Sequence, residues 1–305
     1  LNFGSYDSTG AMGYAIAFKT PRNLVRVNFG GVAATGSRKV ADYSVGMNPS
    51  CLYSVDIDKD GDLDLLVANA DGASVQIMKN DGMENLPVTS TLSLSPGLSA
   101  VVAGDIDDNG TIDIVAVNKT TTGLHILLGD GSGGYVDNGD GRGSGGPAPV
   151  SLALGDLNSD GLPDIVIANQ GQGPVQGTVQ IFFNDPLRKG HFRNGMFDVK
   201  FATGAGTSSV LLDDIDGNGF TDLMASVTDA NKIAVYEFEK NAATPYYLDT
   251  EDKPKQLALV DLNGDGFRDL AVVCAGKSTV NVFINKLGAG FRDVQAQSFP
   301  SPYST

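Results

Sequence analysis

Carboxylates recur through the chain at a spacing that suits a hard metal cation. The pattern Asp-x-[Asp/Asn]-x-[Asp/Asn]-Gly-x-x-Asp occurs five times, at Asp56–Asp64, Asp105–Asp113, Asp156–Asp164, Asp214–Asp222 and Asp261–Asp269. Side chains at positions 1, 3 and 5 can converge on one point. The glycine at position 6 permits a sharp reversal, and the aspartate at position 9 can complete an all-oxygen cage. Such a set of hard oxygen ligands favours Ca²⁺ over zinc or copper.

Each loop is therefore predicted to supply four side-chain ligands and the backbone carbonyl of position 7, and we predict about five Ca²⁺ ions in all. The predicted ligands are Asp56, Asp58, Asp60, Asp62 and Asp64; Asp105, Asp107, Asn109, Thr111 and Asp113; Asp156, Asn158, Asp160, Leu162 and Asp164; Asp214, Asp216, Asn218, Phe220 and Asp222; and Asp261, Asn263, Asp265, Phe267 and Asp269. A single copy could be only an Asp/Asn/Gly turn, but five copies in register argue against that interpretation. An EF-hand would need Glu at position 12, where this chain has apolar residues.

The charge balance excludes some classes of partner. The chain has 36 Asp and Glu against 21 Lys and Arg, a formal charge of −15, so its surface would repel a nucleic-acid backbone. Sixteen of these acids occupy the four side-chain positions of the loops. Five Ca²⁺ ions would bring the charge to about −5. No apolar run approaches the length of a membrane span, and two cysteines, Cys51 and Cys274, cannot form a disulfide framework.

The loops mark an internal repeat, because their starts are 49, 51, 58 and 47 residues apart. One more copy fits before Asp56, where Ser5, Asp7, Thr9 and Gly13 replace the acidic set. The predicted repeats are 1–50, 51–99, 100–150, 151–208, 209–255 and 256–305, in one domain spanning 1–305.

Each repeat has the pattern of four strands around its loop. In the second repeat these are Cys51–Val55, Leu65–Ala68, Val75–Met78 and Thr89–Leu94, and no stretch has a convincing helical period. This predicts an all-β propeller of six four-stranded blades, or seven if residues are missing at the N-terminus. The innermost strands of each repeat are the most apolar, as a propeller blade requires. If Leu1 is a mature end, we expect its strand to close against the last repeat near Phe291–Phe299.

At these loops the sequence resembles the FG-GAP/VCBS repeat family, most specifically in Gly104–Gly110 and Gly155–Gly161. These repeats occur in integrin α-subunit heads, bacterial surface and secreted proteins, and a fungal propeller lectin. The resemblance implies a β-propeller with Ca²⁺ between the first and second strands of a blade, and an extracellular, cell-surface or periplasmic setting. It carries the calcium role onto the five acidic loops and not onto the degenerate first one.

Three functions remain open. We expect first a calcium-stiffened binding, adhesion or structural module whose partner is an extracellular protein or polysaccharide, with no nucleic acid bound and no membrane insertion. A lectin is the alternative, although the absence of Trp removes the usual sugar-stacking side chain. A polysaccharide-degrading enzyme is the third, but no catalytic residues are predicted, and His125 fits a structural position.

Two irregular segments could carry further sites. The glycine-rich stretch Gly129–Pro147 contains Asp130, Asp137 and Asp140 and is interpreted as a flexible turn in preference to a cation or binding loop. An insertion holds the basic cluster of Arg188, Lys189, His191 and Arg193, which could bind an anionic glycan or acidic partner, although a solvated loop is favoured. Asn118-Lys119-Thr120 also matches a glycosylation acceptor.

Overall fold

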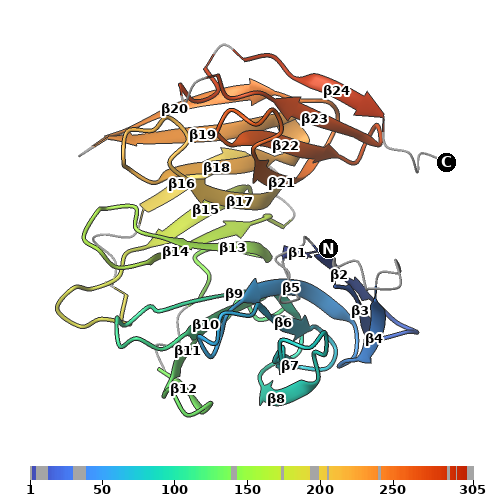
Figure 1. Ribbon diagram of the computed structural model, residues 1–305. Coiled ribbons are helices and arrows are strands. Elements are labelled where there is room, and N and C mark those ends of the chain that lie inside the picture. The colour runs from blue at the N-terminus through green and yellow to red at the C-terminus, as the bar shows by residue number, and fades with distance from the viewer. Residues whose placement is uncertain are drawn as a thin grey trace. The chain divides into compact units, whose positions relative to one another are not determined.

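The fold consists of strands that pair in chain order. The computed structural model describes residues 2–4, 13–29, 39–138, 143–172, 175–192, 199–204, 206–239, 242–286, 289–292 and 294–300. Their strands form six four-stranded antiparallel sheets, each built from four consecutive strands (Figure 1). The predicted all-β, six-bladed propeller is confirmed. The chain divides into two compact units, Leu1–Gly143 and Ser144–Thr305, with three blades in each.

The blades are numbered in chain order. Those of the first unit are β1 (Asn2–Gly4), β2 (Gly13–Phe18), β3 (Leu24–Asn28) and β4 (Val40–Ser44); β5 (Pro49–Val55), β6 (Asp64–Asn69), β7 (Ser74–Met78) and β8 (Val88–Ser93); and β9 (Leu98–Gly104), β10 (Asp113–Asn118), β11 (Leu124–Gly129) and β12 (Tyr135–Asp137). Those of the second are β13 (Pro149–Gly155), β14 (Asp164–Asn169), β15 (Gly177–Phe182) and β16 (Val199–Gly204); β17 (Thr207–Asp213), β18 (Asp222–Val227), β19 (Lys232–Glu239) and β20 (Ala242–Asp249); and β21 (Pro254–Val260), β22 (Asp269–Cys274), β23 (Thr279–Phe283) and β24 (Gln297–Pro300).

The described residues contain one helical element, the single 3₁₀ turn Thr228–Ala230. Within them, no helix has both the length and the apolar character needed to cross a bilayer.

The second strand of a blade, and not the first, is the most buried. Every residue of β6, β10, β14 and β18 is buried, whereas β5 and β21 are largely half-buried or exposed. In β6 the reason is visible, because Leu65 and Val67 pack in a cluster with the first blade while Leu66 and Ala68 pack in a cluster with the third. A strand covered on both faces is a continuous apolar run.

Serine hydroxyls join the first strands of neighbouring blades. Ser50 on β5 donates to the carbonyl of Leu98 on β9 at 2.8 Å, and Ser208 on β17 donates to that of Lys255 at 2.8 Å. Each bond links two strands that belong to different sheets of the same unit. The apolar clusters and these polar links together hold adjacent blades.

The N-terminal strand completes its own blade. β1 pairs with β2. The expected closure of this strand against the last repeat near Phe291–Phe299 remains a prediction. The last blade is completed by β24, which pairs with β23 and begins at Gln297. Phe291 is fully buried in the cluster shared by the fifth and sixth blades, and it therefore anchors a turn instead of starting the strand.

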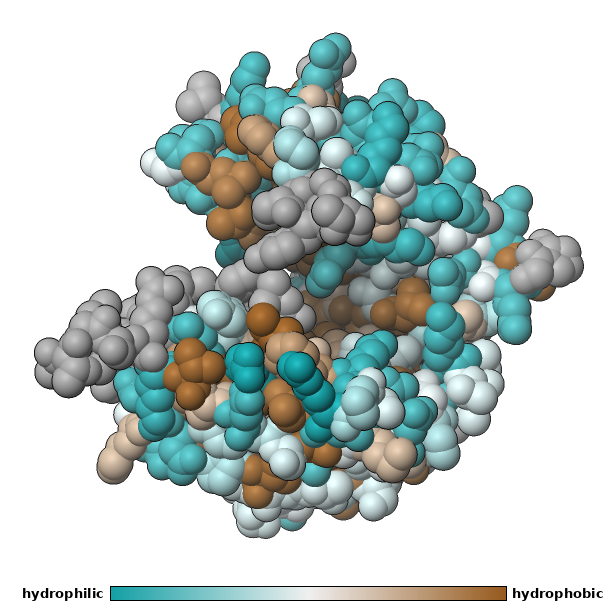
Figure 2. All heavy atoms as spheres, turned by 90° about the vertical axis from the view of Figure 1, so that its right-hand side faces the viewer, coloured by the Kyte–Doolittle hydropathy of each residue, from teal (hydrophilic) through white to brown (hydrophobic). Residues whose placement is uncertain are grey.

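The exposed surface is mainly hydrophilic. On the face seen in Figure 2, hydrophobic side chains lie in small groups among hydrophilic ones. Scattered apolar residues of this kind are normal for a protein surface.

Candidate metal centres

Each acidic loop connects the first and second strands of blades two to six. In every copy position 9 is the first residue of the second strand, and its Cα pairs with the last residue of the first strand, as in Val55 with Asp64 and Gly104 with Asp113. The loop is therefore a hairpin whose closing residue is a predicted ligand. The five equivalent residues are Asp64, Asp113, Asp164, Asp222 and Asp269, all of them fully buried.

Two residues in each loop have left-handed backbone. Position 6 is glycine throughout, with φ between +84° and +96°, and no atom lies within 4 Å of a Cβ built there. Backbone conformation, not lack of space, therefore selects glycine at this position. Position 4 is also left-handed and holds Lys59, Asp108, Ser159, Gly217 and Gly264. The sequence argument missed this second reversal, which the glycines in the last two copies could have indicated.

The first and last carboxylates organise the backbone of each loop. Asp105 accepts the N–H groups of Asn109 at 3.0 Å and Gly110 at 2.9 Å, and the other four copies repeat this pair. Asp113 accepts the N–H of Ile106 at 2.8 Å and of Gly129 at 2.7 Å. One buried carboxylate thus joins its loop to the end of the third strand.

The same link to the third strand occurs in all five copies. The donors are Asn80, Gly129, Asn184, Phe238 and Asn285. Sequence reasoning did not identify these residues, because their backbone N–H groups make the contact and their side chains vary.

Three carboxylates converge in three of the loops. Oxygens of Asp56, Asp58 and Asp64 lie within 4.8 Å of one another, as do those of Asp105, Asp107 and Asp113 and those of Asp214, Asp216 and Asp222. These are positions 1, 3 and 9, and an oxygen-only set of this kind fits a hard divalent cation such as Ca²⁺. In the third and fifth loops position 3 is Asn158 or Asn263, whose amide offers a neutral oxygen.

The side chain at position 5 accepts a hydrogen bond from the backbone of its own loop. Asp60 accepts the N–H of Asp62 at 2.9 Å, and Asp160 and Asp265 make the same bond to Leu162 and Phe267. Asp60 is not part of the converging group of its loop. Its role as a ligand, and that of the position-7 carbonyls, remain predictions.

Burial makes Asp64, Asp113, Asp164 and Asp222 hard to ionise without a cation. It raises the pKa of Asp64 to about 6 and the pKa values of Asp164 and Asp222 to about 7, although two backbone N–H donors act in the opposite direction on each. The pKa of Asp113 is raised for the same reason. A bound cation would offset this cost by stabilising the ionised carboxylate.

The basic insertion forms a compact turn next to β15. His191 donates its N–H to the carbonyl of Arg188 at 2.9 Å, and Asp185 donates to that of His191 at 2.8 Å. Arg188 and Lys189 are exposed and His191 is half-buried, whereas Arg193 lies outside the described residues. The proposed partner-binding role of this cluster remains a prediction.

The glycine-rich stretch is ordered at its start. Asp130 accepts N–H groups from Ser132 at 2.8 Å and Gly134 at 2.9 Å, and the chain continues into β12. This corrects the interpretation of that part as a flexible turn. Asp140 lies outside the described residues.

His125 joins a loop to a sheet edge. Its Nε2 lies 3.3 Å from the Ser95 hydroxyl and its Nδ1 lies 3.4 Å from Asp137. The order of groups is that of a serine–histidine–aspartate triad, but both distances exceed the roughly 2.6–3.2 Å of a coupled pair. We interpret the contacts of His125 with Ser95 and Asp137 as structural.

The structure also describes the two cysteines and the glycosylation motif at Asn118. Cys51 and Cys274 are free thiols, in agreement with the sequence. Asn118 is fully buried and donates its amide to the carbonyls of Ser95 and Pro96, so it is not available as a glycosylation acceptor.

The blades and loops together define a repeat protein of the β-propeller class with acidic cation cages. A sequence model of the FG-GAP-like repeat matches residues 56–116, 105–167, 156–225 and 214–272. The chain belongs to the FG-GAP-like repeat family.

Known proteins share parts of this sequence and fold. Integrin alpha-IIb of Mus musculus is 36% identical over 102 residues, which are 32% of this chain and 10% of that protein. The chain thus spans about a tenth of this curated relative.

Among solved structures, a chain of the BBS1N complex with ARL6DN has a TM-score of 0.65 at 15% identity and covers 99% of this chain and 81% of its own. An Agrocybe aegerita lectin that recognises non-reducing terminal N-acetylglucosamine has a TM-score of 0.60 at 17% identity, with coverages of 97% and 79%. These structural likenesses concern the fold.

Proposed function

We propose that the protein is a calcium-stabilised extracellular module that binds a protein or a surface polysaccharide. The carrying observation is the repeated cage, in which one fully buried carboxylate and two more accessible ones converge between two strands. Similarity to an integrin α subunit supports an extracellular, adhesive setting. Propellers present loops from every blade, which suits broad contacts.

We extend the calcium role to all five acidic loops. The third and fifth repeat the backbone bonds of positions 1 and 9 and differ mainly by an asparagine at position 3. An amide oxygen is an ordinary Ca²⁺ ligand. The third and fifth loops carry three carboxylates among their four side-chain ligands, as the second and fourth loops do, so these four sites should bind with similar affinity.

Calcium titration of chelator-treated protein tests the stoichiometry. Isothermal titration calorimetry should give about five ions, with the tightest site at the first loop, which has four carboxylates where each of the others has three. A control with Mg²⁺ should show weaker binding, because that ion demands a near-ideal octahedral set. No heat above the Mg²⁺ control would contradict the calcium assignment.

Binding screens test the partner class. Calcium-loaded protein is applied to a glycan array and to a panel of extracellular proteins, with a chelator-treated sample as the control. Calcium-dependent capture of a glycan would favour the lectin alternative, which the likeness to the Agrocybe lectin raises. Capture of a protein would favour adhesion.

We propose no catalytic role. Polysaccharides incubated with the protein should yield no new reducing or unsaturated ends. Fluorophosphonate should not label Ser95, because its pairing with His125 is long. Product formation that is lost on Ser95→Ala would overturn this view.

A further inference from the structure

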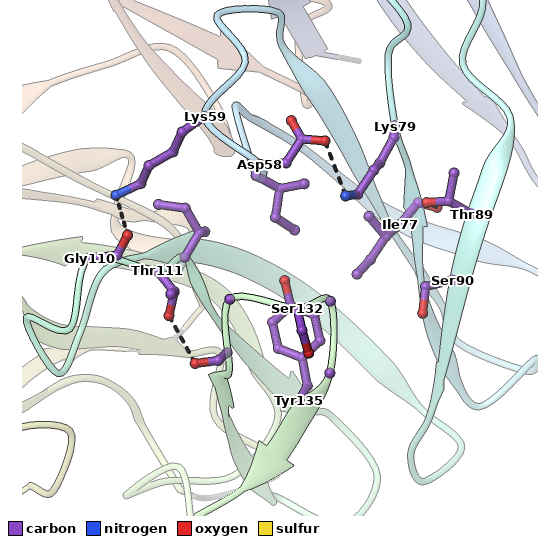
Figure 3. Close-up of a pocket in the computed structure, with 16 residues that line it drawn as sticks. Asp58, Lys59, Ile77, Lys79, Thr89, Ser90, Gly110, Thr111, Ser132 and Tyr135 are labelled. Atoms are coloured by element: carbon purple, nitrogen blue, oxygen red, sulfur yellow. Dashed lines mark hydrogen bonds and ion pairs between the residues drawn. The ribbon is translucent and has the colours of Figure 1, made fainter.

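We infer that a cavity between the second and third blades binds an acidic sugar of the hexuronate type. The inference rests on the proposed function as an extracellular binding module. The cavity has a volume of about 430 Å³ and lies entirely in the unit Leu1–Gly143. Its walls come from the first two acidic loops, the end of β7, β8, and the turn before β12 (Figure 3). This volume is within the roughly 300–1,000 Å³ of small-molecule sites.

Two lysines line opposite sides of the cavity. Figure 3 shows Lys59 and Lys79 on opposite sides. The Lys59 amine donates to the carbonyl of Gly110 at 2.6 Å, and the Lys79 amine lies 3.1 Å from Oδ2 of Asp58. An ammonium group has three donors, so both amines keep donors for a ligand while their positions are held.

The charge of the cavity depends on the cation cage beside it. Asp58 is the acidic residue of the lining, and it is also a member of the first converging carboxylate group. A cation bound there would offset the Asp58 charge and leave two ammonium groups facing the cavity. In a protein of formal charge −15 this is a local positive site, and it favours a carboxylate ligand.

The uncharged lining points to a sugar. Hydroxyl groups come from Thr89, Ser90, Thr111, Ser132 and Tyr135. The remaining side chains include the Tyr135 ring and three isoleucines, at 57, 77 and 112. Hydroxyls suit a ring with many hydroxyl groups, and apolar side chains suit its C–H face. A lone Asp or Glu side chain of a peptide would use the amines and leave most of the hydroxyls unused.

Internal hydrogen bonds hold the turn before β12, which forms one wall of the cavity. Asp130 fixes it through the N–H groups of Ser132 and Gly134, and the left-handed Gly131 and Gly133, with φ of +74° and +92°, bring its backbone to the cavity. No atom lies within 4 Å of a Cβ built on Gly133. A preformed wall reduces the ordering cost of binding.

The test compares two glycosides that differ in one group. Methyl β-D-glucuronide and methyl β-D-glucoside are titrated into wild-type protein in saturating Ca²⁺, and binding is followed by NMR. The glucuronide should bind at least ten-fold more tightly, and added salt should weaken it because the attraction is ionic. Equal binding of the two glycosides, or no binding of either, overturns the inference.

Substitutions locate the site. Lys59→Gln/Lys79→Gln should weaken glucuronide binding at least ten-fold. The matched control is Lys232→Gln/Lys277→Gln, which removes two exposed lysines paired with Asp249 and Glu251 in the other unit and should change nothing. Lys79→Gln alone keeps the Lys59–Gly110 contact and should still weaken binding. Unchanged affinity in these variants, or tighter binding of an Asp- and Glu-containing peptide at the same lysines, overturns the inference.

The two proposals fail differently. If the cavity binds no uronate but the protein still captures another extracellular polymer or protein in calcium, only the cavity assignment fails. If no calcium-dependent capture occurs on the glycan and protein panels, the binding-module function fails as well.

Discussion

In the acidic loops, the backbone conformation of two positions determines which residue types each position accepts. Position 6 needs a positive φ although space is open around it. Position 4 needs the same conformation but accepts lysine, aspartate and serine in three copies. The side chains at position 4 are exposed to solvent. The free-energy cost of the left-handed backbone is therefore the main penalty for a residue other than glycine there.

Gly161→Ala should therefore destabilise the protein by about 1–2 kcal/mol, because an L side chain is strained in the left-handed region. The measurement is chemical denaturation in saturating Ca²⁺. Gly143→Ala is the matched control, since Gly143 has no positive φ and a Cβ there makes only an ordinary contact at 3.6 Å. Equal effects of the two substitutions would refute the backbone argument.

Three buried aspartates at position 9, Asp64, Asp164 and Asp222, predict an inverted pH dependence without calcium. Their ordinary pKa is 3.8, and burial raises it to about 6 for Asp64 and about 7 for Asp164 and Asp222. A raised folded-state pKa gives stability that is full below the ordinary value and is lost as the pH rises through the folded value.

In a chelator, the melting temperature at pH 5 should therefore exceed that at pH 8. With Ca²⁺ the order should reverse, because the cation binds the ionised carboxylates. Differential scanning calorimetry across this range checks both. A chelated protein that is more stable at pH 8 would contradict the burial argument.

Among the elements, the second strand of each blade carries the core. Leu66 on β6 is fully buried and packs toward the third blade, whereas Leu52 on β5 is only half-buried. Leu66→Ala should cost about 2–5 kcal/mol in free energy of unfolding, as expected for a cavity in a packed core. Leu52→Ala is the matched comparison and should cost clearly less. Denaturant melts that rank the two equally would show that the first strand contributes as much as the second.

Much of this element order follows from the sequence. The second strand of the second repeat is predicted at Leu65–Ala68 and is observed at Asp64–Asn69 (β6), because an aspartate at position 9 precedes an apolar run. The same aspartate and apolar run occur at β10, β14 and β18. The loops were located by the same residues, and three of the five carboxylate groups converge as predicted.

What the sequence did not reveal is which faces the strands bury. Leu65 and Leu66 are equally apolar, and only the neighbouring blades decide which cluster each enters. The residues that donate to position 9 from the third-strand side could not be predicted either. They donate through backbone N–H groups, which almost every residue type has.

For the whole molecule, the net charge predicts that bound calcium stabilises the fold. Sixteen carboxylates lie at the predicted ligand positions, and they repel one another when no cation is bound. Excess EDTA should lower the melting temperature markedly, since a ligand that binds only the folded state stabilises it.

Sodium chloride should partly restore the melting temperature of the chelated protein by screening this repulsion. It should change the calcium-loaded protein less. A melting temperature that is the same in EDTA and in Ca²⁺ would disprove a stabilising role for the ions.

The pairing of each described sheet from four consecutive strands has a consequence for how such a chain arises. β1 pairs within its own repeat, as β24 does within the last one. A gene segment that encodes one repeat therefore carries every hydrogen-bonding partner that its sheet requires. Duplication or loss of such a segment would add or remove a whole blade without leaving a strand unpaired, so blade number can change during evolution while the calcium loop is inherited with each copy.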